Sequence, residues 1–338
     1  MEMKLIVQTE ASGLGGASVT TITDYAQVTQ EVEIVMERLD SPGKMTFVCL
    51  EEGEIAIPEG SAVECSVDGM KMFKGYVMAI ERTRSGETTY TAYDQLRYLK
   101  ANASYAFEHM TLSQIIQQIA ADFGLMTGTL ADTGYVFPCL VKEDEGCLDI
   151  IFDALTQTII QTGKIFLFYD NAGALTLVEA KDLFNQTILG DESLVTDYTY
   201  KRDIDSDTYN RVKLVRRNEE TGRTDAYTHE DTDTIKKWGL LQYYSEVDEN
   251  LNDAQIDELC ALYLKYYNRV LQTLTIEAMG VTSIRAGSII PVKIAGVEGL
   301  APSRLLLAEK VTHNFDGDSH TMSIEVKSFD QLGGENIV

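Results

Sequence analysis

Short runs of β-branched and aromatic residues, each ended by a turn signal, follow one another through the first hundred residues. The turn signals include Ser41-Pro42-Gly43 and Pro58-Glu59-Gly60. Asp68-Gly69 is typical of a tight hairpin, because glycine accepts the positive φ that such turns require. The candidate strands are Met3–Gln8, Gln30–Arg38, Lys44–Glu51, Ala62–Val67, Lys71–Arg82 and Glu87–Tyr93. Strands at this spacing predict a closed or nearly closed β-barrel over residues 1–104.

The pattern changes to helical periodicity after residue 105. The segment Thr111–Phe123 places five apolar side chains on one helical face, with Thr111 as a plausible N-cap and Gly124 as a stop signal. A second amphipathic helix is predicted over Asp149–Thr162. Two strands are expected after it, Lys164–Tyr169 and Ala174–Glu179, joined by an Asp-Asn-Ala-Gly turn. We therefore expect an α/β insertion domain over residues 105–192.

Strand patterns return from Thr196 onward and are interrupted by one helix, Asn252–Asn268, with Asn252 as its N-cap. The predicted strands are Thr208–Arg217, Thr224–His229, Thr273–Ala278, Ser288–Ile294, Leu305–Phe315 and Ser319–Ser328. We expect a second β-barrel domain over residues 193–338. The predicted fold class is α+β and mainly β: two β-barrel-like tube domains, a helical α/β insertion between them, and helix 252–268 in the C-terminal half.

The net charge of −25 arises from 28 Lys and Arg against 53 Asp and Glu. It argues against a protein that grips nucleic acid, because such binding neutralises phosphates with basic side chains. Carboxylates lining a channel would instead repel passing DNA. Taken alone, the charge is better explained as an acidic surface that keeps the protein soluble.

Neither a membrane span nor a secretion signal is expected. No run approaches 18 consecutive apolar residues. The segment Met1–Glu10 indicates a first strand and lacks the features of a signal peptide, so we expect synthesis and folding in the cytoplasm. Five widely spaced cysteines without a CxxC pattern predict buried free thiols in a reducing compartment.

Catalytic motifs are missing from the sequence. It contains no Walker A loop, GxGxxG, HExxH or GxSxG, and none of its four histidines stands in a recognised nucleophile context. Two histidines and two aspartates within eight residues are candidate metal ligands: His313, Asp316, Asp318 and His320. The favoured interpretation of this stretch is a hairpin turn between two strands. We expect no cofactor and no metal.

A cell-wall hydrolase is the main alternative. It would need two carboxylates held in a cleft, one of them with a raised pKa. The acidic runs Glu143-Asp144-Glu145 and Glu246, Asp248, Glu249 supply candidates, although 53 acidic residues make chance candidates inevitable. Trp238, Tyr243 and Tyr244 could form a sugar platform, but aromatic residues in this setting more often form a core or a protein interface.

Several stretches resemble one family when they are taken together and in order. They are Ser41–Phe47, Phe73–Val77, Tyr90–Leu99, Asn210–Val212, Lys237–Gln242, Arg285–Ser288, Val311–Phe315 and His320–Met322. In this order they are similar to the XkdQ-like hub proteins of contractile tails, which occur in myovirus-type phages, defective prophages and tailocins. The resemblance spans nearly the whole chain, and no single stretch is specific by itself.

The resemblance implies a structural protein and not an enzyme. It implies a homotrimer whose six tube domains form a pseudo-sixfold ring between the hexameric tail tube and the trimeric central spike. Expected partners are the tail tube protein, the central spike protein and other baseplate proteins, with DNA only as cargo that does not stick. The expected location is a phage tail or tailocin particle. The residues that the resemblance marks as structural are Tyr93, Asp94, Gln95, Leu96, Tyr98, Leu99, Trp238, Gly239, Arg285 and Gly287.

Two alternatives stay open beside the hub. One is a tail-associated peptidoglycan hydrolase or cell-wall-binding protein, with residues 105–190 as its active module. The weaker one is a secreted carbohydrate-binding β protein, which the missing signal segment and the single tryptophan disfavour.

Overall fold

The computed structural model describes residues 1–12, 18–50, 56–217, 223–247, 251–297, 300 and 303–328 of the 338-residue chain. Strands predominate and helices are fewer, which confirms the predicted α+β, mainly β class. The chain divides into two compact units. The first comprises Met1–Thr199 and Thr275–Val338, and the second comprises Tyr200–Leu274. Among the described residues, no helix combines the length and the apolar character needed to cross a bilayer.

Thirteen strands form one large sheet, almost all of it from the first unit. Its main path runs β14-β18-β21-β20-β3-β4-β7-β6-β5-β1-β2, with β19 beside β20 and β13 beside β19. The strands are β1 (Met3–Ser12), β2 (Ser18–Asp24), β3 (Thr29–Glu37), β4 (Lys44–Leu50), β5 (Ala62–Val67), β6 (Met70–Arg82), β7 (Glu87–Tyr93), β13 (Leu189–Gly190), β14 (Val195–Asp203), β18 (Leu271–Met279), β19 (Ile289–Lys293), β20 (Arg304–Asp316) and β21 (Ser319–Lys327).

Strict alternation of buried and half-exposed residues marks the strands that form the core of the first unit, as in β4, β5 and β7. Phe47 and Tyr90 stack inside that core with ring centroids 5.0 Å apart, and Phe315 from β20 belongs to the same cluster. The predicted hairpin at Asp68-Gly69 is confirmed, since both residues have positive φ and β5 pairs with β6 across them.

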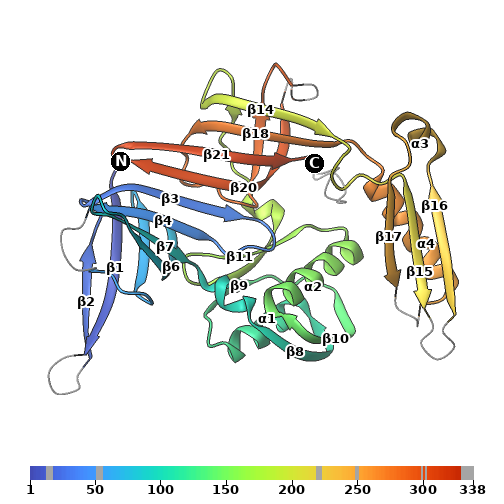
Figure 1. Ribbon diagram of the computed structural model, residues 1–338, viewed down its shortest axis with the longest axis horizontal. Coiled ribbons are helices and arrows are strands. Elements are labelled where there is room, and N and C mark those ends of the chain that lie inside the picture. The colour runs from blue at the N-terminus through green and yellow to red at the C-terminus, as the bar shows by residue number, and fades with distance from the viewer. Residues whose placement is uncertain are drawn as a thin grey trace. The chain divides into compact units, whose positions relative to one another are not determined.

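The first and last β segments of the chain share this sheet. Strand β20 pairs antiparallel with β3 from Lys310↔Glu37 to Asp316↔Glu31, and Figure 1 shows the red strand beside the blue one. Just beyond the pairing, Arg38 and Glu309 form a part-buried bidentate ion pair with N–O distances of 2.8 and 3.2 Å. The two β segments are therefore continuous with each other. The three-part division at residues 104 and 192 stays a prediction.

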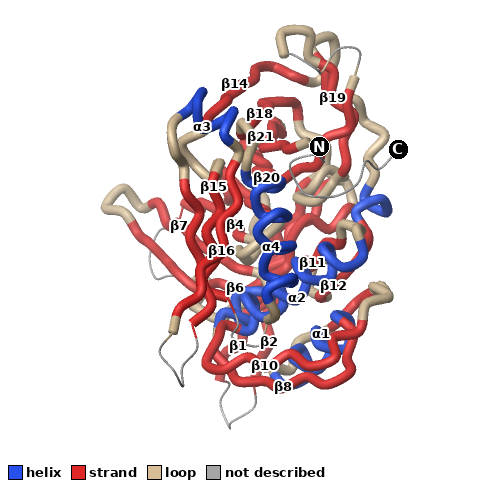
Figure 2. The backbone as a smooth tube through the Cα atoms, turned by 90° about the vertical axis from the view of Figure 1, so that its right-hand side faces the viewer, coloured by secondary structure: helices blue, strands red, loops and turns tan. Residues whose placement is uncertain are grey.

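Residues 95–183 form the helical segment between these β segments. Helices α1 and α2 confirm the two predicted helices, and Thr111 caps α1 in a capping box with Gln114. Figure 2 shows α1 lying against the antiparallel ribbon of β8 and β10. The elements are η1 (Gln95–Lys100), β8 (Asn102–Thr111), α1 (Leu112–Asp122), β9 (Thr127–Leu130), β10 (Val136–Gly146), α2 (Cys147–Thr162), β11 (Phe166–Asp170), β12 (Leu175–Glu179) and η2 (Ala180–Leu183).

The second unit is a three-stranded sheet with the order β16-β15-β17, in which β17 runs parallel to β15. Helix α4 packs on one face through Ile256 and Cys260, which contact Val212 and Leu214. Asn252 caps α4 as predicted. The elements are β15 (Arg211–Arg217), β16 (Thr224–Glu230), α3 (Thr232–Trp238), β17 (Gln242–Val247) and α4 (Asp253–Tyr267).

Candidate functional site

The run from Asp94 to Leu99, directly after β7, connects the first β segment to the helical segment. Asp94 caps η1, and its carboxylate accepts hydrogen bonds from Leu96 N at 3.0 Å and Gly43 N at 2.8 Å. Leu96 and Leu99 are buried in the core of the helical segment. Tyr98 is 37% exposed. The run therefore fixes the point where the chain leaves the first sheet.

Gln95 extends this connection to a residue that sequence reasoning placed only in a turn. Its Nε2 donates to Asp170 Oδ2 at 2.8 Å, and its Oε1 accepts from Met126 N at 3.1 Å. Asp170 in turn accepts a hydrogen bond from Gly173 N at 2.6 Å, which holds the turn after β11. No local pattern could have paired Gln95 with a carboxylate 75 residues away.

Arg285 connects the last β segment to Tyr169 and Asp170. Its Nη2 donates to the carbonyl oxygen of Asp170 at 3.2 Å, and its guanidinium carbon lies 3.5 Å from the centroid of the Tyr169 ring. Gly287 has φ +90°, and an ideal Cβ there would lie 2.8 Å from Leu167 Cδ1. We call Asp94, Gln95, Asp170 and Arg285 the buried junction.

The charges of the buried junction are strongly desolvated. Burial raises the pKa of Asp94 well above its usual value and the negative charge of Asp170 adds to this, while two backbone N–H groups oppose it. Burial also raises the pKa of Asp170 and lowers the pKa of Arg285. Arg285 is the positive charge that attracts both carboxylates, so removing it would leave two desolvated carboxylates that repel each other.

A small cavity lies beside the buried junction. It has a volume of about 30 Å³ and is lined by Asp94, Asp170 and Arg285 among others. Ligand pockets are typically about 300–1,000 Å³, whereas a space of this size suits a single water molecule. Arg285 Nε is buried without a partner in the described structure and could bind that water. The geometry suits a rigid joint and is too small for a sugar.

The four candidate metal ligands lie in and around the predicted hairpin. Asp316 pairs with Ser319 across the turn, so Asp316 and Asp318 sit at its exposed end. His313 is fully buried: its Nε2 lies 2.8 Å from the Ile284 carbonyl oxygen and its Nδ1 lies 2.9 Å from His320 Nε2. Within the described residues, no three His, Cys, Asp or Glu side chains are placed to hold a metal ion.

The carboxylates proposed for a hydrolase site form local pairs or belong to different units. Lys142 Nζ forms ion pairs with Glu145 and Asp153 at 2.9 and 2.6 Å, and Asp144 accepts a hydrogen bond from Asn102 at 3.2 Å. Glu143 is exposed beside them, and Glu246 lies on β17. Asp248 and Glu249 lie outside the described residues.

The proposed sugar platform is not formed by neighbouring tyrosines of β17. Consecutive strand residues point to opposite faces, so Tyr243 and Tyr244 cannot share one surface. Tyr243 stacks with Tyr267 at 4.9 Å inside a tyrosine cluster, while Tyr244 is 59% exposed. Trp238 ends α3, and the following Gly239 accepts a hydrogen bond from Asn210 Nδ2 at 2.7 Å.

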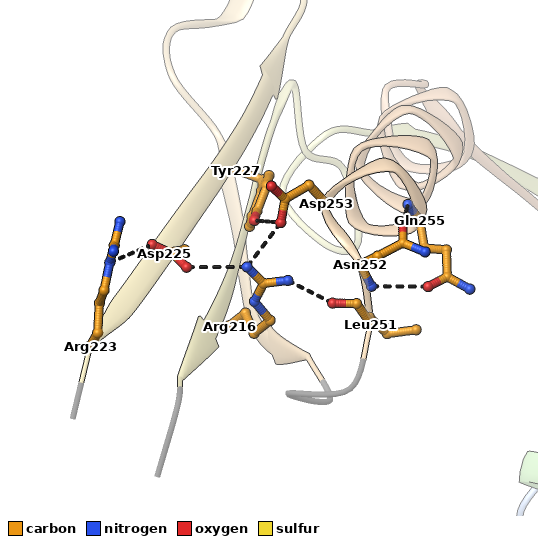
Figure 3. Close-up of polar contacts among 8 residues, drawn as sticks. All are labelled: Arg216, Arg223, Asp225, Tyr227, Leu251, Asn252, Asp253 and Gln255. Carbon is orange, nitrogen blue, oxygen red and sulfur yellow. Dashed lines mark hydrogen bonds and ion pairs between the residues drawn. The ribbon is translucent and has the colours of Figure 1, made fainter. Parts of the chain in front are cut away.

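A second polar cluster ties α4 to its sheet within the second unit. Arg216 on β15 contacts Asp225 at 3.1 Å and Asp253 at 2.9 Å, and donates to the Leu251 carbonyl oxygen at 2.7 Å (Figure 3). Tyr227 donates to Asp253 at 2.7 Å. This arrangement anchors the N-terminus of α4 and fixes the compact unit internally.

Comparisons with known proteins match almost the whole chain. Residues 32–327 match the family model described as YQBQ-like. In Bacillus subtilis (strain 168), the uncharacterized protein YqbQ is 32% identical over 306 residues, which is 88% of this chain and 92% of YqbQ. The phage-like element PBSX protein XkdQ of the same strain is 31% identical over 330 residues, 96% of each chain.

Among solved structures, the fold is similar to that of the prophage MuSo2 43 kDa tail protein from Shewanella oneidensis. The TM-score is 0.69 at 13% sequence identity, with 97% of this chain and 99% of that chain covered. At this identity the likeness concerns the fold alone.

Proposed function

The chain belongs to the YQBQ-like family, and from this premise we propose that it is the structural hub of a contractile tail baseplate. In this proposal three copies form a pseudo-sixfold ring that joins the hexameric tail tube to the trimeric central spike. The hub acts without catalysis. The observation that carries the proposal is end-to-end similarity to a protein of a phage-like element.

The continuous sheet supports this arrangement. Each subunit contributes one β segment before the helical segment and one after it, and β3 and β20 join them side by side. Three such subunits would present six β segments in a ring, which matches a sixfold tube on one side and a threefold spike on the other. The buried junction supports the same role, because it fixes both segments to the helical segment between them.

The proposed partners follow from the position of the hub: the tail tube protein, the central spike protein and other baseplate proteins, in a phage tail or tailocin particle. DNA would pass through the channel of the ring as cargo. A trimer would carry three times the net charge of −25, and carboxylates facing the channel would keep DNA from sticking.

Analytical ultracentrifugation of the purified protein tests the proposal directly. We expect a trimer, and we expect a larger complex when the cognate spike protein is added. Electron cryomicroscopy of that complex would then reveal threefold symmetry with six related β segments. A protein that stays monomeric at all concentrations and ignores the spike protein would contradict the hub.

A further inference from the structure

A groove on the first unit gathers basic side chains in a chain that has few of them. It has a volume of about 790 Å³ and is lined by Lys44 from β4, Arg97 and Lys100 from η1, and Lys310 from β20. Glu33 and Glu37 from β3 also line it. We call this the basic groove. Its four cations outnumber its two carboxylates although the protein as a whole is strongly acidic.

Two of the four basic side chains form ion pairs with carboxylates of the groove itself. Lys310 Nζ lies 2.8 Å from Glu37, which raises the pKa of Lys310, and Lys44 Nζ lies 3.7 Å from Glu33. Their positions follow from the strand register, because Lys310 is opposite Glu37 across β20 and β3, and Lys44 on β4 is diagonal to Glu33 on β3. These two pairs fix the walls of the groove and contribute little net charge.

Arg97 and Lys100 are different, because neither forms an ion pair with any residue in the described ranges. Both side chains are exposed and belong to the last turn of η1, a 3₁₀ helix. Residues three apart in a 3₁₀ helix lie on the same side, so the two cations project together. The negative end of the helix dipole stabilises them locally but leaves their outer side open to a further anion.

The same chain contains a strongly acidic segment. Residues 105–192 contain 13 Asp and Glu against three Lys and no Arg, a net charge of −10. Several of these carboxylates are exposed, Glu108 and Glu143 among them. A threefold ring is built from head-to-tail contacts, so two different patches of one chain must fit each other.

We propose that the basic groove binds the acidic surface of residues 105–192 of the next copy of this chain. The inference rests on the proposed trimer and names the contact that orients its subunits. Opposite charges on the two faces would speed association and would also fix the register of the ring, since a wrong orientation would place like charges together. Half-exposed charges in such a contact make trimer formation sensitive to salt.

Charge reversal tests the groove. The variant R97E/K100E should trimerise at least roughly tenfold more weakly than the natural protein at moderate salt, measured by ultracentrifugation. The matched control is K236E/K237E, which makes the same charge change on α3 and should trimerise normally. Circular dichroism verifies that both variants fold. If the natural protein is a trimer and R97E/K100E trimerises equally well, the groove contact is wrong and the hub proposal still stands. A monomeric natural protein would overturn both.

Crosslinking of the natural protein identifies the occupant without any variant. Trimers assembled from isotopically heavy and light chains are treated with a carbodiimide, which joins a lysine amine to a carboxylate in direct contact. We expect heavy-to-light crosslinks from Lys100 or Lys44 to carboxylates of residues 105–192. Crosslinks from these lysines only to other regions would overturn the proposal. So would duplex DNA that binds the natural protein and not R97E/K100E, since the groove would then serve phosphates.

Discussion

The buried histidine pair makes the stability of the first unit depend on pH in a way that one substitution can reveal. His313 is completely buried, and burial lowers its pKa to about 4. The Ile284 carbonyl can only accept, so His313 Nε2 carries the hydrogen and Nδ1 accepts from His320 Nε2. A proton added to Nδ1 would face another donor 2.9 Å away.

The sign follows from linkage. The unfolded chain takes up the proton near pH 6.5 and the folded protein only near pH 4, so the unfolded state binds more protons between these values. The free energy of unfolding therefore falls as the pH drops through this window. From about pH 7.5 to about pH 5 the loss from His313 alone amounts to about 2 kcal/mol, which keeps the measurement above the isoelectric point.

The substitution His313→Gln removes this titration, and comparison at each pH removes the contributions of groups that do not contact His313. One such group is Asp94, whose raised pKa acts in the opposite direction because its stabilisation is lost as pH rises. His320 does contact His313 and also has a pKa lowered by burial, so the comparison reports the histidine pair. Urea unfolding followed by far-ultraviolet circular dichroism gives the free energy of unfolding of both proteins. We expect the natural protein to exceed the variant at neutral pH and the gap to narrow by about 2 kcal/mol on acidification.

Trp238, the only tryptophan, provides an internal control. It lies in the second unit, so its fluorescence follows the unfolding of that unit. The unfolding curve measured by this fluorescence should therefore change with pH in the same way in the natural protein and in the variant. A gap between natural protein and variant that stays constant over the pH range would refute the argument. That result would mean that His313 titrates alike in the folded and unfolded states.

Three further predictions concern other contacts. Gly75→Ala should lower the free energy of unfolding by about 3 kcal/mol in urea titrations, because an ideal Cβ would lie 2.2 Å from the Tyr93 carbonyl oxygen. Gly69→Ala is the control, because an added Cβ there meets no atom within 4 Å and the only cost is the backbone strain of a positive φ. Arg38→Met removes the bidentate partner of the part-buried Glu309 carboxylate, which keeps Lys327 at 3.6 Å as an ion-pair partner, and should cost about 2 kcal/mol. A thermal midpoint equal to that of the natural protein would contradict this. Arg216→Met should speed amide hydrogen exchange in the first turn of α4 and leave exchange in the first unit unchanged.

The elements with a clear period were predictable from the sequence. Strands β5 and β7 have the predicted bounds, because their side chains alternate strictly between core and surface. Strands β8 and β10 were not predicted. They form a two-stranded ribbon. In β10 Val136 and Val141 are exposed and burial does not alternate, and β8 alternates mostly between exposed and half-buried residues, so neither strand has a clear apolar period. The same holds for β2, where Ile22 is 68% exposed.

The candidate site was predictable only in part. The run around Asp94 and the pair Arg285 and Gly287 stood out as similar to a family, and the structure brings them together. Asp170, which joins them, was placed only in a turn, because its partners come from segments far away in the sequence. The compact second unit was not recognised either, since compactness depends on contacts among segments and not on the pattern of any one.

The pairing of β20 with β3 has a consequence for how the chain is made. The Arg38–Glu309 contact beside it spans 271 residues, so the edge of β3 emerges from the ribosome long before its partner strand exists. Contacts of such long range slow folding, and an uncovered strand edge can pair with another chain during the wait. We expect chains truncated before β20 to aggregate during synthesis, and we expect the last strands to trigger folding of the first ones.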